Sequence, residues 1–133
     1  RRADSQLVFD IDIAKAQTND NPVYYIQYAH ARICSVLGQW AGDVNSLKTV
    51  NLSPLNMPNE AKLMQRLSEY PEIVATAATD LAPHTIANYL KECASDLHSY
   101  YNDTKFLVDD APTKLARLAL IAATQQVLKN GLN

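Results

Sequence analysis

The sequence has little glycine, little cysteine and almost no excess of charge of either sign. Its 133 residues include three Gly and two Cys, and 12 Lys and Arg stand against 14 Asp and Glu. The glycines form no Gly-x-Gly pair, which excludes a glycine-rich phosphate loop, and therefore an ATP site, within this chain. The cysteines are too few for a disulfide framework or a four-cysteine zinc site, so a reducing cytoplasm is the expected location. A net charge of −2 argues against indiscriminate nucleic-acid binding but allows RNA recognition by a local patch of aromatic and polar groups.

Long apolar runs are also missing. No run approaches the ~20 residues that a membrane-spanning helix needs, and the first residues precede no long apolar segment of the kind found in signal peptides. With 47% hydrophobic and 20% charged residues, the composition is that of an ordinary globular protein. At roughly 100–200 residues per domain, the length allows one domain, or one domain plus a fragment.

Apolar residues recur at the spacing of an amphipathic helix along most of the chain. One stripe that is expected to face the core comprises Ile73, Val74, Ala77, Ala78 and Leu81. A second stripe comprises Ile86, Leu90, Cys93, Leu97 and Tyr100. A third stretch, 115–128, is apolar on most sides and predicts a central, largely buried helix.

Prolines and loop-forming residues divide the chain between these stripes. Four prolines stand where helices are expected to begin, since proline at the first helical position loses no needed N–H: Pro58, Pro71, Pro83 and Pro112. A further helix is predicted over 23–37, loops over 43–57 and 104–111, and an extended piece over 6–11. The fold prediction is an all-α, antiparallel bundle of about five or six helices.

No group of side chains in the sequence predicts catalysis or metal binding. The histidines at 30, 84 and 98 are far apart, and none belongs to a His-x-x-x-His pair. Asp109 and Asp110 share a predicted loop without a partner acid at helical spacing. A small stand-alone enzyme is therefore disfavoured, and no catalytic residue, metal ligand or cofactor is expected within this chain.

The most unusual segment is 21–32, in which three of the seven tyrosines fall within five residues, beside Gln, His and Arg. On a helix, Tyr24 and Tyr28 share a face. Aromatic rings beside amide and guanidinium groups supply the stacking surfaces and the fixed donors and acceptors that recognition of single-stranded RNA requires. The same pattern also fits tyrosines that pack the bundle and direct their hydroxyl groups to a polar rim. Both interpretations stay open at this point.

Two further pairs of residues are assigned by their position on the predicted helices. Tyr100 continues the second stripe and is expected in the core, whereas Tyr101 is rotated off that stripe and is the better candidate for a ligand contact. Cys34 and Cys93 both lie on apolar helix faces and are expected to be inert core residues.

Residues 3–17, together with 19–32 and its core Tyr25-x-Gln27-Tyr28-Ala29-His30-x-Arg32, resemble bacterial arginyl-tRNA synthetases. The similarity lies at the junction where the class I catalytic domain is followed by the C-terminal DALR-type anticodon-binding domain. The stretch 117–132 resembles the closing helix of that domain. The resemblance implies that 1–17 ends the catalytic domain and that 18–133 is the helical anticodon-binding domain, truncated at its C-terminus.

The resemblance also implies a function. The domain would grip the anticodon arm of tRNA-Arg and adjoin the catalytic domain of the same chain, as a cytoplasmic monomer without membrane contact. The expected tRNA-binding residues are Asn19, Asn21, Tyr24, Tyr25, Gln27, Tyr28, Arg32 and Tyr101. The HIGH and KMSKS motifs of class I synthetases do not occur here, so the joining of arginine to tRNA, with ATP and magnesium, would belong to the parent enzyme. The alternative is a non-catalytic helical module that binds another protein.

Overall fold

The computed structural model describes residues 21–132, and within them it contains α-helices, one short 3-10 helix and no strand. The helices are α2 (Pro22–Trp40), η1 (Val44–Thr49), α3 (Pro58–Ser68), α4 (Tyr70–Thr79), α5 (Pro83–Asp103) and α6 (Ala111–Leu132). The all-α prediction is confirmed. The predicted extended piece over 6–11, the boundary at 17/18 and Asn19 lie outside the described residues.

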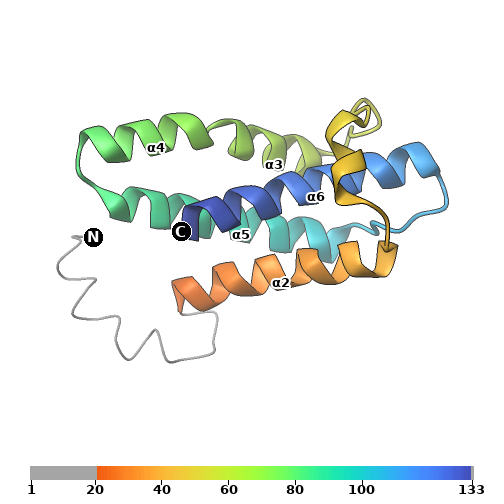
Figure 1. Cartoon of the computed structure of the whole chain (residues 1–133), viewed down its shortest axis with the longest axis horizontal. Helices are drawn as coiled ribbons and strands as arrows, with labels where there is room; N and C mark the ends of the chain where they lie inside the picture. The colour runs from red at the N-terminus through yellow and green to blue at the C-terminus, as the bar shows by residue number, and fades with distance from the viewer. Residues whose placement is uncertain (1–20, 133) are drawn as a thin grey trace.

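The helices form a bundle around α5 and α6 (Figure 1). These two run antiparallel to one another, α3 and α4 lie end to end along one side of α5, and α2 lies along the other side. Helix α2 runs parallel to α5, so both helices begin at the end of the molecule where α6 finishes. Helix α5 is therefore the element that brings α2, α3, α4 and α6 together.

Helix α2 has well-defined signals at both ends. The side-chain oxygen of Asn21 accepts hydrogen bonds from the backbone N–H groups of Val23 (3.0 Å) and Tyr24 (3.2 Å), and Pro22 occupies the first turn. This is a standard N-cap, which satisfies donors that the helix cannot satisfy itself. At the other end, Ala41 adopts a left-handed conformation with φ 61° and donates its N–H to the Leu37 carbonyl.

The other predicted boundaries agree with the structure except in one loop. Pro58 and Pro83 begin α3 and α5, and Pro71 and Pro112 are the second residues of α4 and α6. The predicted loop over 43–57 is wrong in its first half, where Val44–Thr49 forms a 3-10 helix. Asp43 caps this helix by accepting a hydrogen bond from the Asn45 N–H.

The core follows the second apolar stripe closely. Leu90, Cys93, Leu97 and Tyr100 of α5 are all at most 2% exposed. They pack against buried residues of the other helices, among them Ile33, Leu63, Leu118, Ile121 and Leu128. Burial raises the pKa of the Cys93 thiol to about 11, which keeps it protonated and confirms the expectation of an inert core cysteine.

The prediction for the other cysteine is wrong. Cys34 is exposed at the edge between α2 and α6, where its Sγ accepts a hydrogen bond from the Gln125 amide (3.0 Å) and lies 3.5 Å from His30 Nδ1. Its neighbours on the apolar face, Ile33 and Leu37, take the buried positions instead. A helical residue next to a buried stripe is not itself buried unless a second helix covers it.

The first apolar stripe is only half buried, which corrects the expectation that it faces the core. Helix α4 packs against α5 through Ala77, which is buried, and Ile73, which is partly buried. Val74, Ala78 and Leu81 are exposed. Helix α4 ends at Thr79, so Leu81 leaves the stripe, and Val74 and Ala78 lie on the side of α4 that no other helix covers within the described residues.

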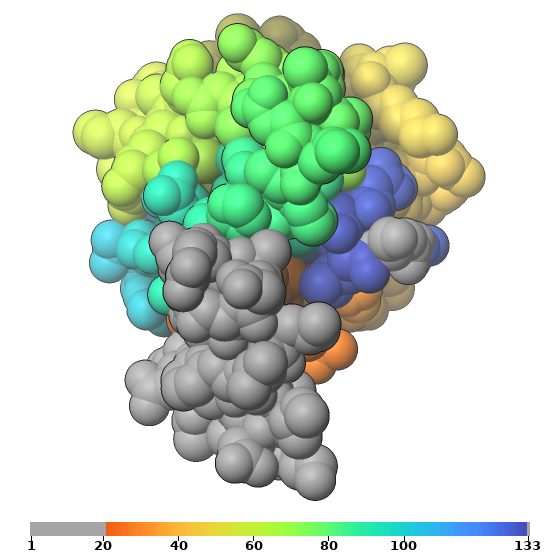
Figure 2. Space-filling model, turned by 90° about the vertical axis from the view of Figure 1, so that its left-hand side faces the viewer, coloured from red at the N-terminus to blue at the C-terminus, as the bar shows by residue number. Residues whose placement is uncertain are grey.

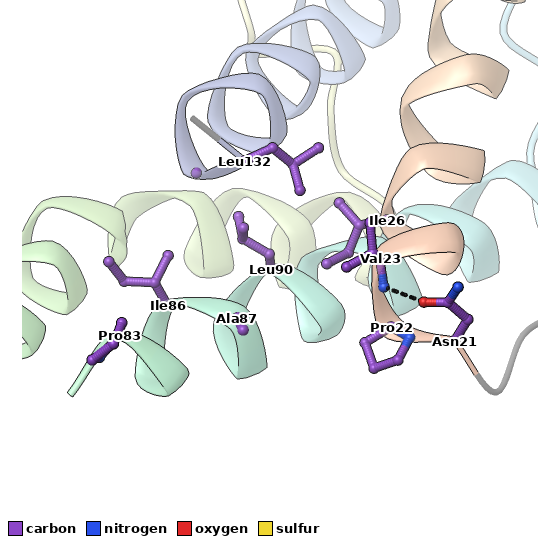
Figure 3. Close-up of a pocket in the computed structure, with 10 residues that line it drawn as sticks. Asn21, Pro22, Val23, Ile26, Pro83, Ile86, Ala87, Leu90 and Leu132 are labelled. Carbon is purple, nitrogen blue, oxygen red and sulfur yellow. Dashed lines mark hydrogen bonds between the residues drawn. The ribbon is translucent and has the colours of Figure 1, made fainter. Parts of the chain in front are cut away.

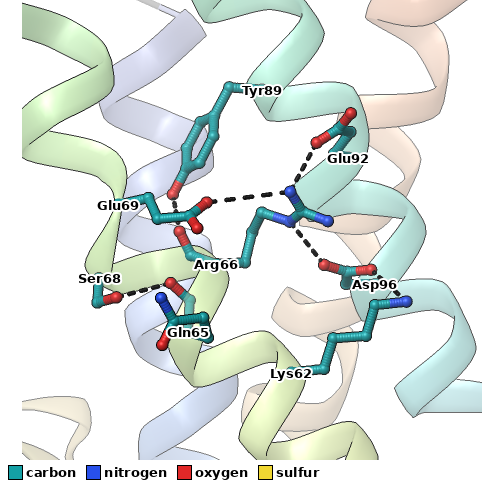
Figure 4. Close-up of polar contacts among 8 residues, drawn as sticks. All are labelled: Lys62, Gln65, Arg66, Ser68, Glu69, Tyr89, Glu92 and Asp96. Carbon is teal, nitrogen blue, oxygen red and sulfur yellow. Dashed lines mark hydrogen bonds and ion pairs between the residues drawn. The ribbon is translucent and has the colours of Figure 1, made fainter.

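Two polar networks connect the helices. In the first, Arg66 of α3 lies between carboxylates of α5, 2.8 Å from Asp96 and 2.6 Å from Glu92 (Figure 4). Lys62 also reaches Asp96, at 3.4 Å, and the Tyr89 hydroxyl donates to the Arg66 carbonyl. This network runs from the interior to the surface, since the Asp96 side chain is 7% exposed and the Glu92 side chain is 60% exposed.

The second network is in the interior. The Glu60 carboxylate of α3 is completely buried and accepts hydrogen bonds from the Tyr100 hydroxyl of α5 (2.6 Å) and from Arg117 Nε of α6 (3.0 Å). Its other oxygen accepts from the Met57 N–H at 3.0 Å. A buried charge is tolerated only when it is paired and hydrogen-bonded, and Glu60 meets both conditions.

Candidate nucleic-acid interface

Five of the residues predicted to bind RNA meet where α2 packs against α5. We call this group, together with two α5 residues that contact it (His98 and Asn102), the tyrosine–arginine cluster. It consists of Tyr24, Tyr25, Tyr28, Arg32, His98, Tyr101 and Asn102. The helical spacing accounts for the α2 half, because residues four apart lie one above another on a helix.

Flat groups are stacked within the cluster. The rings of Tyr24 and Tyr28 lie 6.2 Å apart and are nearly parallel, at 11°. The Arg32 guanidinium carbon lies 4.5 Å from the centroid of the Tyr28 ring and 4.5 Å from that of Tyr101. A guanidinium over an aromatic face is a favourable cation–π arrangement, and here one guanidinium contacts a ring from α2 and a ring from α5.

Hydrogen bonds hold Arg32 in this position. Its Nη2 donates to the Tyr28 hydroxyl at 2.9 Å, and its Nη1 lies 3.2 Å from His98 Nδ1 and 3.5 Å from Asn102 Oδ1. Arginine can only donate, so His98 Nδ1 must accept. The imidazole is then neutral and carries its proton on Nε2, which faces the Tyr25 carbonyl at 3.5 Å.

The charge of Arg32 is not neutralised by an acid among the residues that the structure describes. Every partner just named is uncharged, whereas Arg66 and Arg117 each form ion pairs with carboxylates. Tyr28, which carries the guanidinium on its ring, is 38% exposed. The cluster thus presents a positive charge and aromatic surface at the same place.

Sequence analysis missed His98 and Asn102, although the necessary signal was present. His98 precedes Tyr101 by three residues and Asn102 by four, so all three share one face of α5. Once Tyr101 is separated from the buried Tyr100, its polar neighbours at helical spacing are the next candidates. The prediction that Tyr100 lies in the core is confirmed by its 0% exposure.

Two of the predicted site residues lie apart from the cluster. Gln27 is exposed on another face of α2, beside His30 of the same helix and Lys129 of α6. Asn21 is buried as the cap of α2 and lines a notch of about 270 Å³ between the starts of α2 and α5 and the end of α6 (Figure 3). The side chains around this notch are hydrocarbon apart from Asn21, whose carboxamide oxygen accepts the capping hydrogen bonds of α2, so the notch offers few groups that could read a base edge.

Other kinds of site are not found within residues 21–132. No group of three His, Cys, Asp or Glu side chains in this range could hold a metal ion. None of the helices here is long and apolar enough to cross a membrane.

The cluster should respond to pH through His98. Burial lowers the pKa of His98, the Tyr25 carbonyl raises it in part, and the Arg32 charge lowers it further. The unfolded chain titrates near 6.5, so unfolding takes up a proton between the lowered folded pKa and about 6.5. The free energy of unfolding is therefore expected to be constant above this window and to fall as the pH is lowered through it.

Urea titrations at pH values from about 7.5 to 5 measure this dependence. His98→Asn should flatten the curve, since it removes the titrating ring while His30 and His84 remain. If the free energy of unfolding changes equally with pH in the parent chain and the variant, His98 does not control the pH dependence of stability.

The fold is all-α, and tyrosine, arginine and amide side chains meet at one surface between α2 and α5, which are the kinds of groups that RNA-binding domains use. The model of the DALR anticodon binding domain matches residues 26–133. This chain belongs to the DALR anticodon-binding domain family.

The similar proteins are consistent with this assignment. The chain is 59% identical over 132 residues to an arginine–tRNA ligase of Thiobacillus denitrificans, and 56% identical over 133 residues to one of Herminiimonas arsenicoxydans. Both alignments cover 99% of this chain but 24% and 23% of the relatives, so the chain spans about a quarter of their length. A crystal structure described as an arginyl-tRNA synthetase from Campylobacter jejuni superposes with a TM-score of 0.75 at 27% identity, covering 91% of this chain and 27% of that one.

Proposed function

We propose that this chain is the anticodon-binding part of an arginine–tRNA ligase and that the tyrosine–arginine cluster contacts the anticodon arm of tRNA-Arg. The observation that carries the proposal is the position of Arg32. Its guanidinium lies against two tyrosine rings and has only neutral partners among residues 21–132. A planar cation of this kind can pair with a phosphate or stack on a base.

The cluster suits the loop of a tRNA better than a helical stem. Bases of a loop can be unstacked and placed against aromatic or guanidinium surfaces, and each such contact is worth ~1–3 kcal/mol. The Asn102 amide and the Tyr24 and Tyr28 hydroxyls supply donors and acceptors at the same surface. Lys105 is exposed beside Phe106, whose ring lies 6.0 Å from that of Tyr101, and adds a second positive charge nearby.

The remaining features of the proposal follow from the longer ligase. Residues 1–17 would end its catalytic domain and 18–133 would form the anticodon-binding domain. Activation of arginine with ATP and magnesium would take place in the part of the enzyme outside this chain. Asn19, Asn21 and Gln27 remain predicted tRNA contacts in addition to those of the cluster, and the enzyme is proposed to act in the cytoplasm as a monomer.

The test is a binding titration of the chain with tRNA-Arg and with a copy whose central anticodon base is changed, each at two salt concentrations. Tight binding that weakens with the base change and falls with salt is the expected result, because phosphate contacts release counterions. Equal binding to both RNAs would reduce the role to a general phosphate contact. Salt-insensitive capture of another protein, without RNA binding, would favour the alternative of a helical protein-interaction module.

A further inference from the structure

Helix α4 and the turn after it expose apolar side chains in a regular pattern. Val74 and Ala78 are spaced by four residues on one face of α4, and Leu81 follows in the turn after the helix; all three are exposed. Leu81 is 87% exposed, more than any other large hydrophobic residue described. Figure 2 shows the end of the molecule at which α4, in green, forms the upper surface.

The backbone of Leu81 adds a second, independent observation. Its φ is 52°, in the left-handed region that favours glycine. The turn is closed by the Ala82 N–H donating to the Ala77 carbonyl (2.9 Å) and the Leu81 N–H facing the Ala78 carbonyl (3.4 Å). This is a Schellman motif with leucine at the position that glycine usually occupies. A conformation that disfavours side chains is thus occupied by a large apolar side chain with no packing partner among residues 21–132.

The charge of this region selects the kind of partner. Between Tyr70 and Pro83 the charged residues are Glu72 and Asp80, both acidic, and the segment contains no Lys or Arg. A phosphate backbone would be repelled rather than bound. The uncharged side chains of Val74, Ala78 and Leu81 fit the surface of another folded protein segment, where their exposed area would be removed from water.

We infer that Val74, Ala78 and Leu81 form a docking face for the part of the same polypeptide that lies outside this chain in the full-length ligase. The relatives are about four times as long as the region matched here, so a large folded partner is available in cis. The inference rests on the proposed function only in requiring that longer enzyme. It does not depend on tRNA binding, since the docking face is on α4 and the tyrosine–arginine cluster lies between α2 and α5.

Hydrogen exchange compares α4 in two forms of the protein, the 133-residue chain and the full-length ligase, both without RNA. The amides of 73–82 are expected to exchange at least about tenfold more slowly in the ligase, because opening of α4 would require undocking. Equal exchange in both forms would overturn the inference. A titration of the same ligase with tRNA-Arg reads out the proposed function separately, so the two ideas can fail independently.

Leu81→Gly sharpens the test because it should not destabilise the 133-residue chain but should weaken docking in the ligase. In the 133-residue chain, glycine relieves the left-handed backbone and removes no packing, so Tm is expected to stay or rise. In the ligase the same change should restore fast exchange in 73–82. Leu52→Gly, at another exposed leucine (45%), is the matched control and should leave the exchange of 73–82 unaltered. Leu81-dependent dimerisation of the short chain in sedimentation, or Leu81-dependent loss of tRNA binding without a change in exchange, would each assign a different partner and overturn the inference.

Discussion

Replacing Glu60 with alanine is expected to lower the free energy of unfolding by about 3–5 kcal/mol, the range seen when one member of a buried ion pair is removed. The Glu60 carboxylate is completely buried and bonds Tyr100, Arg117 and the Met57 N–H. Alanine would leave a phenolic hydroxyl without an acceptor and a largely buried guanidinium without its counter-charge. Both losses carry a desolvation cost that packing cannot recover.

The matched control is Glu92→Ala. Glu92 lies closer to its arginine, at 2.6 Å from Arg66, than Glu60 lies to Arg117, at 3.0 Å. Its side chain is nevertheless 60% exposed, and exposed ion pairs contribute about 0–1 kcal/mol. Urea unfolding of both variants measures the difference. Comparable losses of unfolding free energy in the two variants would show that burial does not determine how much an ion pair contributes to the stability of this bundle.

Replacing Arg32 with alanine is expected to weaken binding to tRNA-Arg by roughly fivefold to 150-fold, which corresponds to the ~1–3 kcal/mol of one stacking contact. Arg32 is the residue that touches both rings and carries the charge. Arg32→Lys should recover part of the affinity and the salt dependence, because the charge remains while the plane is lost. Fluorescence anisotropy with labelled tRNA-Arg at two salt concentrations provides the measurement.

Lys48→Ala removes one positive charge from η1 and is the control for net charge, since η1 packs on α6 and not on the α2–α5 surface. It should leave the affinity within about twofold, because a solvated charge outside the proposed contact surface is screened by salt over a Debye length of ~10 Å. An equal loss in Arg32→Ala and Lys48→Ala would mean that overall charge binds the RNA. Normal affinity of Arg32→Ala for tRNA-Arg would show that the cluster is not the tRNA-binding site.

The helices could be predicted because apolar residues recur at helical spacing in the sequence. On α5, for example, most residues of its apolar stripe are buried in the structure. Leu90, Cys93 and Leu97 are buried at the spacing that the sequence displays. The same reasoning failed for Val74 and Cys34. Periodicity tells which residues share a face, but not whether a neighbouring helix covers that face.

The candidate site was predicted in part for a similar reason. Tyr24, Tyr28 and Arg32 could be grouped because they lie at local helical spacing on α2. Their meeting with Tyr101 depends on the packing of α2 against α5, which no local pattern specifies. Glu60 shows the limit most clearly, since an isolated acid in the first turn of a helix ordinarily faces water, and only the three-helix junction makes it an interior residue.

The contact between Arg32 and His98 joins residues 66 positions apart in the chain. Arg32 can lie over Tyr28 within α2 alone. Its contacts with Tyr101 and His98 form only after α5 has been synthesised and has docked on α2, so the complete cluster does not exist on the growing polypeptide before then. An RNA that binds only the assembled cluster also stabilises the docked helices by mass action. RNA affinity then becomes a measure of completed folding, and a partly folded copy of the chain would not compete for tRNA.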